Sequence, residues 1–239
     1  EMLARALRAN LELPWAYAGI SGVLFFPGFV LITIAGATLV ANELGWGTMQ
    51  RLLGRGRRRG VMVGAKLGLV AVLAAVGVAV GLTAGTAIAA VTSRLLGALR
   101  ADIWADGEIW RSLGVVAARL WAVLTVYGLA AAAAGFVWQS PGVAVGGALV
   151  YYFLETLVSS LIVQTRGWLT GIRPYLLGNV ARALVVDQNP FLVRLAPPGA
   201  GGEALRVLSP PSAWLVLLAY AALFAAISLA LFHRRDLPV

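Results

Sequence analysis

The chain has 239 residues, of which 60% are hydrophobic and 12% are charged, and its formal net charge is +9 at pH 7. A soluble domain is closer to half apolar and a quarter charged, so this composition excludes an ordinary soluble protein. Basic residues of membrane proteins gather in cytoplasmic loops and contact anionic lipid, which explains the positive charge without nucleic acid. The absence of cysteine excludes disulfides, iron–sulfur clusters and thiolate zinc sites.

Five apolar runs are long enough to cross a bilayer, since a helix needs roughly 20 residues for about 30 Å of hydrocarbon. The second is too long for one straight crossing and is expected to tilt or to extend beyond the bilayer. Barrel strands would alternate apolar and polar residues, so the predicted fold is an all-α, polytopic membrane helix bundle forming one domain over residues 1–239. The predicted spans are 15–40, 61–96, 113–138, 143–163 and 212–232.

Two of the connections have predictable structure. The sequence Gln139-Ser140-Pro141-Gly142 favours a tight turn between the third and fourth spans. The segment 164–211 is the longest region between spans. Its moderately apolar part, Trp168 to Val186, is broken by Pro174 and predicts short helices at the outer interface, with Trp168 and Tyr175 as anchors.

The distribution of arginine predicts the orientation. The loop 41–60 carries five arginines and the C-terminal tail carries Arg234 and Arg235, so the positive-inside rule puts the loop and the C-terminus in the cytoplasm. The expected location is the inner (plasma) membrane. Five spans would leave residue 1 outside, and a sixth span upstream would resolve this.

The sequence lacks the usual motifs of a hydrolytic site. It contains no GxxxxGK(S/T) phosphate-binding loop and no HExxH. It also has no carboxylate cluster suited to a metal. We therefore expect no enzymatic activity and no cofactor in this chain.

Gly77, Gly81 and Gly85 form two overlapping GxxxG steps in the second span. They place a smooth strip on one helix face, against which another helix can approach closely. The strip could form a seam with a second subunit. Packing within the chain is the alternative.

Arg119 and Glu155 are charges set inside spans. If the third and fourth spans form a hairpin, both residues lie roughly 9–12 Å below the outer surface. An ion pair would then lower the cost of burying each charge. A substrate-facing role and snorkelling to the interface are the alternatives.

The segment from Glu43 to Gly60 connects the first two spans. Gly45 and Gly47 loosen the backbone after Glu43, and Thr48 is suited to cap a short helix, Met49 to Leu53. The arginines that follow face water or lipid headgroups. A basic loop that only orients the protein is the simplest interpretation of composition alone.

The stretch ELGWGTMQRLLGRGRRRGVMVGAKL, residues 43–67, resembles the signature of the permease subunit of type-2 ABC exporters. In that family an acidic residue ends a span, and a Gly-Thr pair, a leucine-containing turn, a basic element and a span-opening lysine follow. The ending LFHRRDL, residues 231–237, and the order of the spans are also similar. The matching positions are Glu43, Gly47, Thr48, Leu52, Leu53, Arg59 and Lys66.

The resemblance implies the transmembrane half of a transporter. Two permease subunits, identical or paralogous, would pack together, and each would dock a separate P-loop ATPase that holds ATP and magnesium. The loop 41–60 would be the coupling element. Residues Met49 to Gly54 would contact the ATPase, with Glu43 and the arginines, Arg55 and Arg59 among them, fixing the orientation of the loop.

Two other classes of function remain open at the sequence level. The chain could be a membrane scaffold or accessory subunit that uses its glycines and basic loop for assembly only. An ion-driven secondary transporter is less favoured, because the sequence shows no pair of broken spans in corresponding halves and few intramembrane acids.

Overall fold

The computed structural model describes residues 13, 16–45, 59–95, 97, 106–165, 171–191 and 208–234, with no side-chain description at 44–45, 59, 163–165 and 233–234. All of the regular secondary structure in these ranges is helical. The elements are α2 (Ala16–Gly45), α4 (Arg59–Leu95), α5 (Gly107–Trp138), α6 (Pro141–Thr165), η3 (Arg173–Tyr175), α7 (Leu177–Arg182), η4 (Ala183–Asp187) and α9 (Pro210–Arg234).

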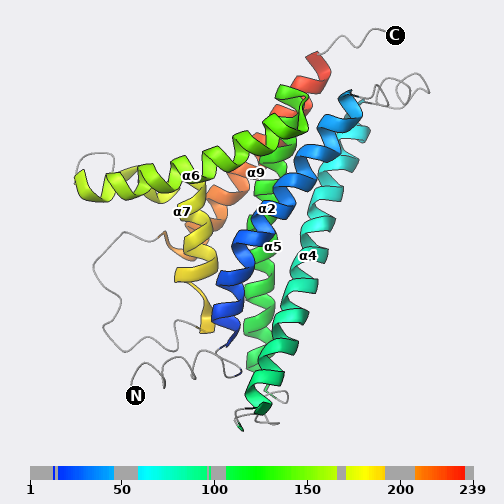
Figure 1. Ribbon diagram of the computed structural model, residues 1–239. Coiled ribbons are helices and arrows are strands. Elements are labelled where there is room, and N and C mark those ends of the chain that lie inside the picture. Colours follow the sequence, from blue (N-terminus) through cyan, green and yellow to red (C-terminus); the bar gives the residue numbers. More distant parts are fainter. Residues whose placement is uncertain are drawn as a thin grey trace.

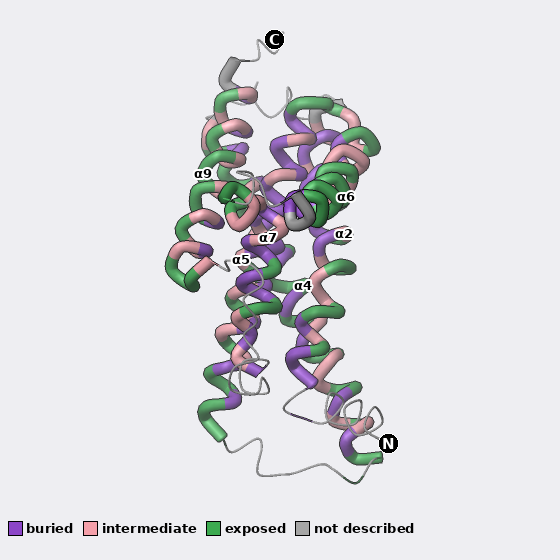
Figure 2. Tube along the Cα trace, turned by 90° about the vertical axis from the view of Figure 1, so that its left-hand side faces the viewer, coloured by how far each residue is buried: buried purple, intermediate pink, exposed green. Residues whose placement is uncertain are grey.

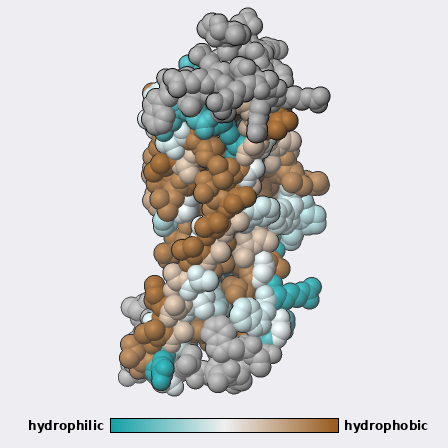
Figure 3. All heavy atoms as spheres, turned by 90° about the vertical axis from the view of Figure 1, so that its right-hand side faces the viewer, coloured by the Kyte–Doolittle hydropathy of each residue, from teal (hydrophilic) through white to brown (hydrophobic). Residues whose placement is uncertain are grey.

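Five helices, α2, α4, α5, α6 and α9, are long and apolar enough to cross a membrane. Each covers one of the five predicted spans, and the predicted all-helical fold is confirmed. At 1.5 Å per residue the 37 residues of α4 extend about 55 Å, so this helix exceeds the hydrocarbon thickness. Apolar side chains are spread over the face on the α4 side of the molecule (Figure 3), as expected for a surface that meets lipid tails.

Helix α5 is the centre of the bundle. It is the most deeply buried of the five long helices, and α2 packs against it more extensively than any other pair of helices packs. Figure 2 shows buried residues along α5, whereas α4, α6 and α9 carry exposed residues on their outer sides. The main core cluster joins α2, α4, α5 and α9 to the short helices α7 and η4.

Two smaller clusters define the ends of the bundle. At one end the final part of α2, the start of α4 and the last turns of α5 and α9 meet around Val40, Val63, Phe136 and Phe232. At the other end the start of α2 and of α5 and the last turns of α4 meet Phe191, whose ring lies 5.3 Å from that of Tyr17. The end of α9 therefore lies at the same end as the base of the basic loop (Figure 1).

The predicted turn between α5 and α6 is confirmed. Helix α5 ends at Trp138, and Gln139 takes the left-handed conformation with φ 54°, donating its N–H to the carbonyl of Gly135. Helix α6 then begins at Pro141, where the fixed φ of proline suits the first helical position.

The direction of α6 differs from the sequence prediction. Instead of returning beside α5 as a hairpin partner, α6 leaves the bundle sideways (Figure 1). The chain reaches the opposite end through α7 and η4, and Phe191 packs there. We call this path from one end of the bundle to the other, over α6 and then α7–η4, the broken crossing.

The short helices of the 164–211 segment are confirmed in part. They occur at η3 and at the continuous run α7–η4, and Pro174 lies inside η3. Leu177, Val180 and Leu184 of α7–η4 are fully buried in the main core, so this run packs into the helix bundle, and its position at the outer interface stays a prediction. Tyr175 is exposed, and its carbonyl accepts a hydrogen bond from the Tyr220 hydroxyl at 3.1 Å. Trp168 lies outside the described residues.

Candidate functional site

An ion pair joins α2 and α4 near the two helix ends that flank the basic loop. The Lys66 ammonium lies 2.6 Å from a carboxylate oxygen of Glu43. It also donates a hydrogen bond to the carbonyl of Leu39 at 2.9 Å. The lysine is buried, whereas the Glu43 side chain is 37% exposed. These contacts tie the first turns of α4 to the last turns of α2, so the loop leaves the bundle from a fixed pair of helix ends.

Most of the predicted coupling residues lie outside the described residues. These are Gly47, Thr48, Met49, Leu52, Leu53 and Arg55. Arg59 is the first residue of α4, and only its backbone is described. Of the acidic and basic residues in the family-like signature, Glu43 and Lys66 are the two whose side chains have defined positions. They meet because α2 and α4, the helices that carry them, pack against each other.

The glycine strip of α4 lies partly against α2. A β-carbon at Gly81 would come within 2.7 Å of the Leu24 side chain, and one at Gly85 within 2.6 Å of the Ile20 side chain. A β-carbon at Gly77 would meet nothing within 4 Å. At Gly81 and Gly85 the structure therefore shows packing within the chain, the alternative to a seam with a second subunit.

A close approach of two helix backbones involves other glycines, which the sequence analysis did not single out. A β-carbon at Gly36 in α2 would collide with the carbonyl oxygen of Gly128 in α5, and one at Gly135 would lie 3.0 Å from the carbonyl oxygen of Ala37. These contacts are to backbone atoms, which cannot rotate away. The α2–α5 crossing therefore depends on small residues.

The predicted ion pair between Arg119 and Glu155 is not formed. Arg119 donates to the backbone carbonyls of Leu184 and Gln188, while Glu155 accepts a hydrogen bond from the backbone N–H of Gly178. The prediction assumed that α5 and α6 lie side by side, and the sideways course of α6 removes that condition. The two charges instead hold opposite ends of the same continuous helical run, α7–η4.

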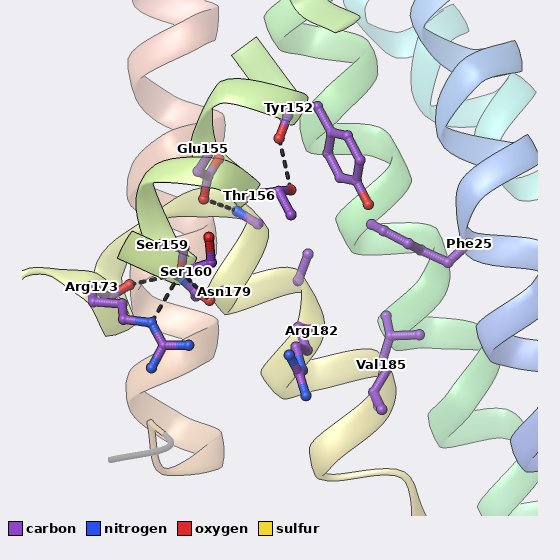
Figure 4. A pocket seen from close by; sticks show the side chains of 13 residues that line it. Phe25, Tyr152, Glu155, Thr156, Ser159, Ser160, Arg173, Asn179, Arg182 and Val185 are labelled. Carbon is purple, nitrogen blue, oxygen red and sulfur yellow. Dashed lines mark hydrogen bonds between the residues drawn. The ribbon is translucent and has the colours of Figure 1, made fainter. Parts of the chain in front are cut away.

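Glu155 lines a cavity of about 450 Å³ between α6, α7 and η4, with Phe25 of α2 at its edge. Its polar wall consists of Thr156, Ser159, Ser160, Asn179 and two arginines, Arg173 and Arg182 (Figure 4). The sequence analysis missed this site, because the serines lie in α6 and the arginines in η3 and α7, which are separate elements along the chain. The pair of adjacent hydroxyl residues inside an apolar span, Ser159 and Ser160, was the sequence signal that could have predicted a polar site in this region.

A hydrogen-bond network fixes the polar wall. The Ser159 hydroxyl donates to the side-chain oxygen of Asn179 at 3.2 Å and accepts from the Arg173 Nε at 3.0 Å and from Asn179 Nδ2 at 2.8 Å. Asn179 Nδ2 also donates to the carbonyl of Arg173 at 2.9 Å. Arg173 and Arg182 both line the cavity, so the two arginines face a common space.

The site gives no indication of a resident metal. Among the described residues, no group of three or more histidine, aspartate or glutamate side chains is arranged to hold an ion.

A scan against models of known protein families finds no match. A search of curated proteins finds no significant match either.

Proposed function

We propose that this chain is the transmembrane subunit of an ABC transporter of the exporter type, embedded in the inner membrane with its C-terminus in the cytoplasm. It would pair with a second permease subunit, identical or paralogous. A separate P-loop ATPase would bind ATP and magnesium and carry out hydrolysis. This chain itself would have no catalytic residue.

The observation that carries the proposal is the Glu43–Lys66 ion pair at the base of the basic loop. A coupling element must transmit a movement of its partner to the helices, and this requires a firm mechanical connection. The ion pair, together with the hydrogen bond from Lys66 to Leu39, joins α2 to α4 where the loop departs. The cluster around Val40, Val63 and Phe232 extends that connection to α9.

The arrangement of the helices supports the same assignment. A force applied at the loop would reach α2 and α4 together, and both helices pack along the central helix α5. Movement of this end relative to the other would change access to the interior from the two sides. Allosteric coupling of this kind needs an element with two states that both sites bias, and α2–α4 is our candidate for that element.

The first test is purification of the complex from its native membrane. We expect a P-loop ATPase at one copy per permease chain. We also expect Glu43→Gln and Thr48→Ala to reduce the transport-linked ATPase activity at least tenfold while the chain stays in the membrane. Arg111→Gln is the matched control, because Arg111 is an exposed residue on α5 near the opposite end of the bundle.

Two results would refute the assignment. Reproducible absence of an ATPase, with another assembly in its place, would make this chain a scaffold or accessory subunit. Full coupling in both loop variants would remove the role assigned to residues 43–60.

A second candidate, an ion-driven carrier, is favoured by one structural observation. The broken crossing α6–α7–η4 carries the buried carboxylate of Glu155, and broken helices with buried acids are common at the ion sites of secondary transporters. The two candidates differ in their energy source. Transport that survives ATP depletion but stops when the proton or sodium gradient is collapsed would favour the carrier.

A further inference from the structure

The cavity between α6 and α7–η4 has two chemically different walls. One wall is apolar and consists of Phe25, Tyr152, Ala181, Val185 and Val186. The other holds the hydroxyls, the Asn179 amide and the two arginines described above. A volume of about 450 Å³ lies within the range of roughly 300–1,000 Å³ typical of small-molecule sites. The shape and lining fit a molecule with one polar and one apolar end.

The hydrogen bonds reveal which polar group the cavity can accept. The hydroxyl hydrogens of Thr156, Ser159 and Ser160 are already donated to Tyr152, Asn179 and Leu157. The Asn179 amide hydrogens are donated to Ser159 and to the carbonyl of Arg173. Among the residues that the structure describes, the donors of this wall that remain are the terminal nitrogens of the two guanidinium groups, so a ligand bound here supplies acceptors.

The charges of the residues that line the cavity also favour an anionic ligand. Arg173 forms no ion pair with any residue that the structure describes, and its hydrogen bond to Ser159 uses only Nε. The Nε of Arg182 lies 3.7 Å from a carboxylate oxygen of Asp187, but the Arg182 side chain is 62% exposed. One acid, Glu155, lines the cavity, and it lies on the far side of Ser159 from both guanidinium groups (Figure 4). An anion therefore has a favourable position between the arginines, away from Glu155.

We propose that this cavity binds an amphiphile that carries a phosphate group. The phosphate lies between Arg173 and Arg182, where planar guanidinium groups donate paired hydrogen bonds to its oxygens. The apolar portion lies against Phe25, Tyr152 and Val185. The inference is independent of the proposed transport function, because it rests only on the lining of this cavity. The ligand could come from the membrane, as a phospholipid, or from solution, as a soluble phosphate compound.

The test uses the purified full chain and two probes that differ only in the phosphate. Isothermal titration with dihexanoylphosphatidic acid should give saturable binding, and dihexanoylglycerol, which lacks the phosphate, should bind at least tenfold more weakly. Arg173→Gln combined with Arg182→Gln should weaken binding of the phosphatidic acid at least tenfold. Arg182→Gln alone should weaken it severalfold, and this variant removes an exposed side chain with little risk to folding. Arg111→Gln should leave the affinity unchanged.

Competition then distinguishes the two sources. Displacement of dihexanoylphosphatidic acid by millimolar inorganic phosphate would show that the phosphate alone is recognised, as for a soluble ligand. Failure of inorganic phosphate to compete, with anionic phospholipid enriched on the protein released from nanodiscs, would identify a membrane lipid. Equal affinity of the wild type and the double arginine variant, or equal binding of the two probes, would overturn the proposal.

Discussion

Arg119 and Glu155 act on one short helical run from opposite ends. The run α7–η4 extends from Leu177 to Asp187. Glu155 accepts a hydrogen bond near its start and Arg119 donates to carbonyls at its end. A negative charge near the N-terminus of a helix and a positive charge near its C-terminus both interact favourably with the helix dipole. Because Leu177 and Leu184 are part of the main core, the two charges help to hold a core element in place.

Loss of the Arg119 side chain should loosen this element. Arg119→Leu leaves two backbone carbonyls without their donor, and an unsatisfied buried group costs about 1–3 kcal/mol. We expect faster hydrogen exchange at the amides of residues 177–188, measured by mass spectrometry, with little change in the rest of α5. Arg111→Gln, on the same helix but exposed, should leave the exchange of this segment unaltered. Unchanged exchange in Arg119→Leu would show that Arg119 does not hold α7–η4.

At the level of elements, the α2–α5 crossing is the most extensive helix contact of the bundle, and glycines bring the two backbones together there. It is made by Gly36 against Gly128 and by Gly135 against Ala37. The helices can approach this closely because no side chain separates their backbones. The glycines of α4 are different, since Gly81 and Gly85 face the side chains of Leu24 and Ile20, which have rotamer freedom.

A pair of glycine-to-alanine variants separates these situations. Gly36→Ala introduces a methyl group against the Gly128 carbonyl, and such overpacking costs about 1–3 kcal/mol. Gly77→Ala adds the same methyl group in open space, and alanine is favoured over glycine in a helix by about 1 kcal/mol. The melting temperature of the purified protein should therefore fall for Gly36→Ala and stay level or rise for Gly77→Ala. A fall of equal size in both variants would contradict the assignment of the α2–α5 contact.

The same elements show which features the sequence could predict. The five long helices follow from the lengths of their apolar runs, which are local properties, and the turn at Gln139–Pro141 follows from local residue preferences. The direction of α6 was not predictable in this way. It depends on contacts such as Glu155 with Gly178 and Phe25 with Tyr152, whose partners lie far apart along the chain. The Gly36–Gly128 contact was missed for the same reason, because spacing within one helix does not identify its partner.

At the scale of the whole molecule, the two helix ends that flank the basic loop and the end of α9 lie at one end of the bundle. The cluster around Val40, Val63 and Phe232 joins the end of α2, the start of α4 and the end of α9. Positive charge concentrated at one end is the arrangement that the positive-inside rule requires. The broken crossing preserves this arrangement, because Phe191 reaches the opposite end before α9 begins.

Helix α5 allows a direct measurement of the orientation. Its 32 residues extend about 48 Å, longer than the roughly 30 Å of hydrocarbon, so both of its ends should reach water. The chain has no cysteine, and single cysteines at Gly107→Cys and Ser140→Cys would mark the two ends. A β-carbon at Gly107 meets nothing within 4 Å, which makes this substitution mild.

We expect a membrane-impermeant maleimide to label Gly107→Cys in intact cells and to label Ser140→Cys only after the membrane is opened. The reason is that Ser140 lies directly after the α5 end that shares its cluster with the base of the basic loop, which the charge asymmetry assigns to the cytoplasm. The reverse labelling pattern would invert the orientation and place the loop 41–60 where no cytoplasmic ATPase could reach it. One labelling experiment therefore tests both the orientation and the proposed coupling role. The proposed phosphate site does not depend on the orientation, because it rests only on the residues that line the cavity.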